Sequence, residues 1–126
     1  MKKVKVLIVD DSSVMRKIVE RSLRLAGLDL EVVLGADNGA DALPLVEQNT
    51  LDMIFSDINM PKMDGLEFVR RLQKIESAQG VPVVMITTEG SQSCVMEALS
   101  LGAQGYIRKP FTADQVKERI IPLLER

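Results

Sequence analysis

Short apolar runs alternate with segments of helical period along the whole chain. Five runs have the length of strands and cover residues 4–9, 30–34, 51–57, 81–86 and 105–109. After each of them, apolar residues recur every three or four positions, as on one face of a helix. Because right-handed crossovers return the chain to the same sheet edge, this alternation predicts an α/β fold with a doubly wound, five-stranded parallel sheet and five flanking helices. Glu31 and Arg108 place the second and fifth strands at its edges.

The first two helices are bounded by recognisable stop and start residues. In the first, the residues expected to face the core are Met15, Ile18, Val19, Ser22, Leu23 and Ala26, and the basic residues, including Arg16, lie on a solvated face. Gly27 is expected to end this helix in a left-handed conformation. Asn38 can cap the second helix, which runs to about Asn49. Since Pro44 removes a backbone donor inside it, we expect this helix to be kinked or to start late.

The remaining helices also begin at capping residues. Asp64 with Glu67 forms a start that is similar to a capping box, and Thr112 with Gln115 forms another. Ser91 is expected to cap the helix between them. In the last helix, Pro122 is expected to kink the final turn.

Polar side chains follow four of the five apolar runs at the point where each run ends. Asp10 and Asp11 follow the first, Asp57 ends the third, Thr87 follows the fourth, and Lys109 closes the fifth. Because the carboxyl ends of parallel strands meet at one edge of a sheet, these groups are expected to share a site. Carboxylates suit a hard divalent cation, and an ammonium with a hydroxyl suits phosphoryl oxygens.

Each of these residues taken alone has an ordinary structural role. Asp10 or Asp11 could cap the following helix, Asp57 could start a turn, Lys109 could be a surface lysine, and Thr87 a strand residue. Their joint placement at strand ends favours a shared site for a divalent cation and a phosphoryl group over these separate structural roles. A carboxylate beside a divalent ion can attack phosphorus in line and form an aspartyl phosphate.

Composition narrows the class of protein. The 126 residues, of which 46% are hydrophobic and 27% charged, predict one domain over residues 1–126. No apolar run approaches the roughly 20 residues of a membrane span. The basic N-terminal residues are followed by a short apolar segment and then by Asp10-Asp11, with no signal-peptide cleavage site, so we expect a mature cytoplasmic chain. The single cysteine cannot form an internal disulfide. A net charge of -2 offers no basic footprint for nucleic acid, and a monomer is the expected state.

A set of motifs spread over the chain resembles the response-regulator receiver domain. It consists of Asp10-Asp11, Asp57 followed by Met60-Pro61 and Asp64-Gly65, Thr87, Tyr106, and Lys109-Pro110. The resemblance implies a flavodoxin-like sheet with strand order 2-1-3-4-5. It also implies a signalling protein of a two-component system that catalyses its own phosphorylation and dephosphorylation.

The resemblance assigns a role to each acid. Asp57 is expected to accept a phosphoryl group from a histidine kinase of the CheA type. Asp11 and Asp57, with Asp10 acting mainly through water and the backbone carbonyl of Asn59, are expected to hold Mg2+.

The resemblance also implies a switch. Thr87 is expected to move to the phosphoryl oxygen, Tyr106 to turn inward behind it, and Lys109 to pair with the phosphoryl charge. The peptide between Lys109 and Pro110 is expected to be cis. The surface that reports the change is expected to cover about residues 91–118, with Tyr106 at its centre.

The expected output is a contact with another protein, because no effector domain is expected beyond Arg126. The run from Met85 to Glu89, with Asn59 near the acceptor, resembles the chemotaxis type of receiver, whose target is the flagellar motor switch protein. The alternative is a phosphorelay intermediate that passes phosphate to a histidine phosphotransfer protein.

Two other classes fit the residues less well. Mg2+-dependent phosphohydrolases with an aspartate nucleophile carry the motif Asp-x-Asp, in which the second acid serves as general acid and base. This chain has Asp57-Ile58-Asn59 and lacks that second acid. A nucleotide-binding module needs a glycine-rich loop after the first strand, where this chain has two acids and two serines.

Overall fold

A single parallel sheet organises the protein. The computed structural model describes residues 3–87, 92–109 and 112–124. Its five strands are β1 (Lys3–Val9), β2 (Asp29–Ala36), β3 (Met53–Asp57), β4 (Val83–Thr87) and β5 (Gly105–Arg108). All neighbours pair in parallel, in the order β2-β1-β3-β4-β5. The predicted doubly wound sheet, its strand order and its two edge strands are confirmed.

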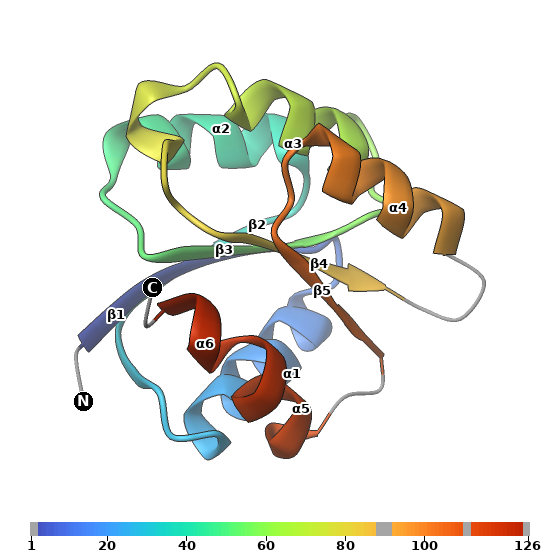
Figure 1. Cartoon of the computed structure of the whole chain (residues 1–126). Coiled ribbons are helices and arrows are strands. Elements are labelled where there is room, and N and C mark those ends of the chain that lie inside the picture. Colours follow the sequence, from blue (N-terminus) through green and yellow to red (C-terminus); the bar gives the residue numbers. More distant parts are fainter. Residues whose placement is uncertain (1–2, 88–91, 110–111, 125–126) are drawn as a thin grey trace.

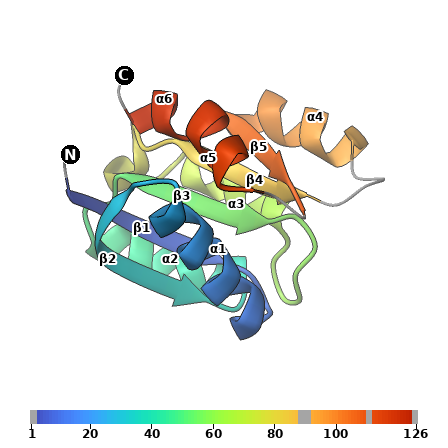
Figure 2. The ribbon, with the colours of Figure 1, turned by 90° about the horizontal axis from the view of Figure 1, so that it is seen from below.

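Helices cover both faces of this sheet. They are α1 (Ser13–Leu25), α2 (Gly39–Gln48), α3 (Gly65–Leu72), a 3-10 turn η1 (Glu76–Ala78), α4 (Gln92–Leu101), α5 (Ala113–Arg119) and α6 (Ile121–Leu124). Figure 1 shows α2, α3 and α4 on one face, and α1, α5 and α6 on the other. The view from below in Figure 2 places α1, α5 and α6 in front of the strands. Within the described residues, none of these helices has the length and apolar character that crossing a bilayer requires.

The central strand β1 supplies side chains to two separate apolar cores. Leu7 and Val9 pack beneath α2 and α3, whereas Val6 and Ile8 pack against α1 and the C-terminal helices. Successive residues of a strand point to opposite faces, and all four side chains are buried. The near-continuous apolar run of residues 4–9 is therefore the signature of a strand covered on both sides.

Most predicted helix boundaries match the structure. Gly27 has a φ of 100° and follows α1, where its N–H and that of Leu28 donate to the carbonyls of Arg24 and Leu23. This pair of bonds is a Schellman motif. Asn38 caps α2 by accepting the N–H of Asp41.

Pro44 does not delay the start of α2. The helix begins at Gly39, directly after its cap, and continues past Pro44 to Gln48. The late start, one of the two expected effects of Pro44, was therefore wrong: the helical backbone tolerates the missing donor at this position. The kink stays a prediction.

The two expected capping boxes differ in completeness. At α5, Thr112 and Gln115 exchange both hydrogen bonds. At α3, Asp64 accepts the N–H of Glu67, but the Glu67 carboxylate pairs with Arg70 and Arg71 instead of returning to the cap. Ser91, the expected cap of α4, lies outside the described residues.

The C-terminal helix is divided near its proline. The helical backbone is interrupted at Ile120, and Pro122 occupies the first turn of α6, where a missing N–H costs no internal bond. The disturbance expected at Pro122 is thus a break that separates α5 from α6.

The inner face of α1 is narrower than predicted. Val19, Leu23 and Ala26 are buried, but Ile18 is 47% exposed. Each residue turns the helix by about 100°, so Ile18 lies well away from the buried line through Val19. The expected placement of Ile18 in the core was wrong.

Candidate functional site

Three carboxylates meet at the carboxyl ends of the adjacent strands β1 and β3. Asp10 and Asp11 follow β1, Asp57 is the last residue of β3, and one oxygen of each lies within 4.8 Å of the others. Asp10 is buried, Asp57 is half-buried and Asp11 is exposed. The cluster is therefore closed by protein at Asp10 and open to solvent at Asp11.

Lys109 reaches this cluster from the end of β5. Its Nζ lies 3.3 Å from Oδ2 of Asp10 and 3.5 Å from Oδ2 of Asp57. The backbone N–H of Lys109 donates to the Thr87 carbonyl over 2.6 Å, which anchors this residue to the end of β4. A single ammonium thus neutralises part of the charge of two acids, at a position where it can also meet an incoming anion.

The pKa of Asp57 is raised above its ordinary value. Burial is the largest cause because it penalises the ionised form, and the charge of Asp10 acts in the same direction. The Lys109 ammonium and the N–H of Ile58, which donates to Asp57 Oδ1 over 2.7 Å, lower the pKa and offset part of the increase. Asp57 is therefore a carboxylate whose ionisation is disfavoured in the folded state.

This shift predicts that replacing Asp57 with asparagine stabilises the metal-free protein at pH 7. A raised native pKa means that the folded state holds the proton more tightly than the unfolded state, so this carboxyl lowers the free energy of unfolding as the pH rises from 3.8 through the raised pKa. Asparagine removes that loss. Urea unfolding of both proteins should show a gain at pH 7 that shrinks towards pH 4.

The exposed cap residue Asp64 provides the control for this experiment. Asparagine also serves as an N-cap, so Asp64→Asn should alter stability little at either pH. A gain for Asp57→Asn that is as large at pH 4 as at pH 7 would contradict the electrostatic explanation.

The loop after Asp57 is held against the strand end by a close backbone contact. The N–H of Gly65 donates to the carbonyl of Ile58 over 2.7 Å. A Cβ on Gly65 would lie 2.3 Å from the Asp57 carbonyl oxygen and 2.9 Å from Cα of Ile58. Only glycine allows α3 to begin this close to the acceptor strand.

The acids at the end of β1 do not cap α1. Ser12 is the N-cap and accepts the N–H of Met15 over 3.1 Å, while Asp10 Oδ1 accepts the N–H of Ser12 over 2.9 Å. Asp10 therefore orders the loop before the helix, and Asp11 is left at the exposed side of the cluster. The capping alternative for these two residues is not what the structure shows.

The remaining predicted residues surround the cluster at different depths. Thr87 is buried at the end of β4, beside Arg108 of β5. Asn59 is exposed two residues after Asp57. Pro110 lies outside the described residues, as do parts of the expected output face around residues 91 and 111.

Tyr106 lies at the surface of β5 and is 37% exposed. The guanidinium of Arg119 on α5 lies 5.0 Å from the centre of its ring, a cation–π contact. Arg119 could not be predicted as a partner of Tyr106, because a charged residue near a helix end carries no signal of its tertiary neighbour. Arg16 was also missed: it was assigned to the solvated face of α1, yet it contacts the backbone of Asp10.

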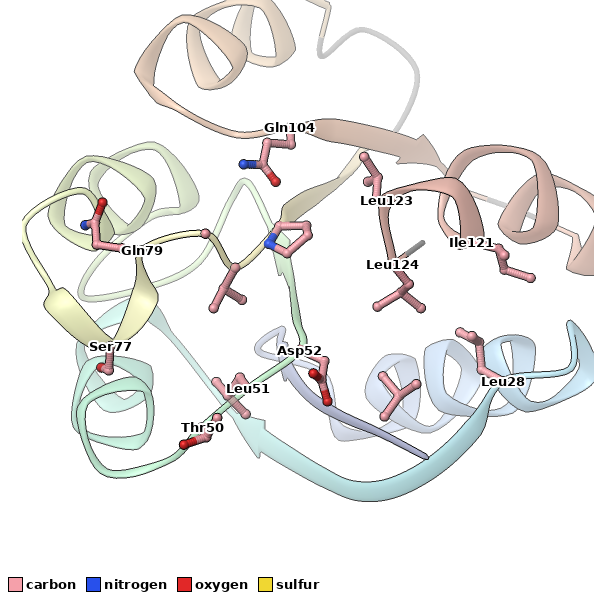
Figure 3. Close-up of a pocket in the computed structure, with 14 residues that line it drawn as sticks. Leu28, Thr50, Leu51, Asp52, Ser77, Gln79, Gln104, Ile121, Leu123 and Leu124 are labelled. Atoms are coloured by element: carbon pink, nitrogen blue, oxygen red, sulfur yellow. The ribbon is translucent and has the colours of Figure 1, made fainter. Parts of the chain in front are cut away.

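A pocket of about 870 Å³ opens at the opposite end of the sheet. Its lining comes from segments that precede the strands, including Leu28, Leu51 and Gln104, and from Leu124 of α6 (Figure 3). Because the acids follow the strands, this pocket does not belong to the acidic site.

Sequence comparison places these features in a known context. The model of the response regulator receiver domain matches residues 6–121. The chain is 40% identical to chemotaxis protein CheY-3 of Vibrio cholerae over 125 residues, which cover 99% of this chain and 95% of that protein. It is 39% identical to chemotaxis protein CheY of Pseudomonas aeruginosa over 122 residues, 97% of each chain.

Solved structures agree with this similarity. A putative response regulator from Chloroflexus aurantiacus aligns with a TM-score of 0.88 at 30% identity, covering 99% of this chain and 100% of that one. The chemotaxis response regulator CheY4 of Vibrio cholerae aligns with a TM-score of 0.80 at 36% identity, covering 93% and 95%. The architecture described above is thus shared over nearly the whole length.

Proposed function

This chain belongs to the response regulator receiver domain family, and from that premise we propose that it is a signalling switch in which Asp57 accepts a phosphoryl group from a histidine kinase. The observation that carries the proposal is the meeting of Asp57 with Asp10, Asp11 and the ammonium of Lys109 at one sheet edge. Residues 1–126 are proposed to form one receiver domain that acts as a cytoplasmic monomer, without a nucleic-acid partner.

The donor set of the site fits Mg2+. Three carboxylates within 4.8 Å of one another are the hard oxygen ligands that this ion prefers, and the exposed side at Asp11 leaves room for the waters that it keeps. Asp10, Asp11, Asp57 and the carbonyl of Asn59 are the residues that would hold it. When bound, Mg2+ supplies positive charge that offsets the charge developing on the phosphoryl oxygens.

The reaction assigned to Asp57 is an in-line displacement. One carboxylate oxygen forms a bond to phosphorus while the bond from phosphorus to the kinase histidine breaks, and the histidine nitrogen leaves with the electron pair. Asp57 must be ionised to attack, and Lys109 favours that form. The same ammonium then lies where it can pair with the phosphoryl oxygens.

Phosphorylation adds negative charge and acceptor oxygens at the end of β3. The groups that gain from this change are the Lys109 ammonium and the Thr87 hydroxyl, and a switch requires that they gain more in one conformation than in another. Tyr106 is the proposed reporter of the change, because it lies on the strand next to Thr87 and reaches the surface beside Arg119.

The proposed target is the flagellar motor switch protein, with a kinase of the CheA type as donor. The support for this choice is that the two relatives compared by sequence, from Vibrio cholerae and Pseudomonas aeruginosa, are chemotaxis proteins. A phosphorelay role, with transfer to a histidine phosphotransfer protein, is the alternative.

Binding of a dye-labelled flagellar-switch peptide tests this function. Fluorescence anisotropy should show severalfold tighter binding when Mg2+ and beryllofluoride, a mimic of the phosphoryl group, are both present. The protein has no tryptophan, so the external dye provides the signal. Asp57→Asn should show no tightening, and Thr87→Ala should load the mimic but tighten weakly.

The outcomes separate the two partners. If the mimic loads, as mass spectrometry under native conditions can verify, and no peptide binds, the flagellar target is wrong. Transfer of phosphate from the phosphorylated receiver to a purified histidine phosphotransfer protein would then support the phosphorelay role.

A further inference from the structure

Arg16 does not behave as the solvated basic residue that its position on α1 suggests. Its side chain is only 22% exposed, whereas the next residue, Lys17, is exposed. The Nη1 atom of Arg16 donates to the backbone carbonyl of Asp10 and, over 2.8 Å, to Oδ1 of Asp37. One guanidinium therefore joins the loop after β1 to the loop after β2.

These bonds hold the Asp10 residue from both sides. Its N–H donates to the carbonyl of Ala36, the last residue of β2, over 3.0 Å. Its own carbonyl accepts from Arg16, which in turn pairs with Asp37, the residue after Ala36. The end of β1 is thus fixed to the end of β2 by a closed ring of hydrogen bonds, which we call the Arg16 clasp (Asp10, Arg16, Ala36 and Asp37).

Gly35 provides the space for this clasp. A Cβ at Gly35 would lie 3.0 Å from Nε and 3.3 Å from Cδ of Arg16, tighter than ordinary contact. Among the described residues, the glycines with positive φ are Gly27, Gly80 and Gly102, so the backbone of Gly35 does not itself require glycine. What glycine contributes at this position of β2 is clearance for the guanidinium.

We propose that Arg16 is a positioning residue for the acidic site, and that the Arg16 clasp raises its affinity for a divalent cation. This inference rests on the metal site of the proposed function. Asp10 is buried and the clasp holds both its N–H and its carbonyl, so a movement of this backbone would displace the carboxylate from its partners Ser12 and Lys109. Mg2+ requires nearly ideal ligand geometry, so a small shift of Asp10 weakens binding.

The charge of Arg16 would act in the opposite direction. A cation near the site repels a second cation, so its removal through charge alone would tighten metal binding. Positioning predicts that removal weakens binding. The direction of the change in Kd therefore separates the two roles. A residue that merely stabilises the fold would leave the Kd unchanged.

The test is a titration of the full-length protein with Mn2+, with the free ion measured by electron paramagnetic resonance. Arg16→Met should raise the Kd about 10-fold, the lower end for loss of a partner that orients a metal ligand. Lys17→Met removes the same charge from the next position of α1 and should leave the Kd unchanged. Far-UV circular dichroism at the titration temperature verifies that each variant is folded.

A second variant reaches the clasp without a change of charge. Gly35→Val places atoms where the guanidinium lies, and valine is favourable in a strand, so it should also weaken Mn2+ binding severalfold. In the double variant with Arg16→Met, the valine should add little, because the side chain that it displaces is already gone.

The outcomes distinguish this inference from the function on which it rests. If the wild-type protein binds Mn2+ and Asp11→Asn weakens binding, the metal site stands, and an unchanged or lower Kd in folded Arg16→Met overturns the role of Arg16. If the wild-type protein does not bind Mn2+, the metal site is wrong and the role of Arg16 falls with it. Full additivity of Arg16→Met and Gly35→Val also overturns the clasp.

Discussion

Replacing Asp57 with asparagine should abolish phosphoryl incorporation, with a loss of roughly a thousandfold or more, as for other nucleophilic residues. Asparagine keeps the size of the side chain and an oxygen that can accept the N–H of Ile58, so the local structure is retained. Its neutral amide oxygen is a poor nucleophile towards phosphorus. Incubation with radiolabelled acetyl phosphate and Mg2+, followed by counting of the protein-bound label, measures the effect.

Two controls test whether the loss of label is specific to Asp57 and whether labelling requires the metal. Asp64→Asn makes the same chemical change at the exposed cap of α3, where asparagine also caps, and should incorporate label at the wild-type level. A chelator should block labelling of the wild-type protein, since the three carboxylates are then left without the cation that compensates them. Persistent label on Asp57→Asn would move the acceptor to another residue.

The arrangement of the sheet and its acidic edge could be predicted from the sequence because both follow from short-range patterns and one topological rule. Apolar runs of strand length alternate with helical periods, and parallel strands place their carboxyl ends together. Asp10, Asp57 and Lys109 each stand at the end of such a run, so their meeting needed no knowledge of side-chain packing. Helix ends were equally accessible where one residue determines them, as at Gly27 and Asn38.

The features that were missed depend on the tertiary neighbours of a residue. Arg16 has the same sequence context as the exposed Lys17, and only the tertiary arrangement of the loops after β1 and β2 gives its guanidinium partners. Arg119 meets Tyr106 because α5 lies beside β5. Ile18 illustrates the converse, an apolar residue in a helical pattern that stays 47% exposed.

Gly65 was partly predicted from the sequence and partly missed. Its replacement by alanine is expected to have the largest effect on stability. The sequence identifies it as a turn residue after Asp64, but the structure shows that it touches the acceptor strand itself. The added Cβ would lie 2.3 Å from the Asp57 carbonyl oxygen and 3.0 Å from Cε of Met85. Since the first of these contacts is with backbone of a central strand, the start of α3 must move, and the bond from its N–H to Ile58 is strained.

Urea unfolding of Gly65→Ala should therefore show a loss of about 3 kcal/mol, the upper end of the usual cost of overpacking a core. Gly105→Ala is the matched control, because within the described part of the chain a Cβ there meets only Cδ1 of Leu123, at an ordinary 3.5 Å, and it replaces a glycine within a strand. That variant should be neutral or stabilised by up to about 1 kcal/mol. Phosphorylation of folded Gly65→Ala should also be slow, because the added Cβ presses on the backbone carbonyl of Asp57 and displaces the acceptor residue. Equal stability of Gly65→Ala and the wild-type protein would show that α3 can withdraw without cost, and that its close approach does not fix the position of Asp57.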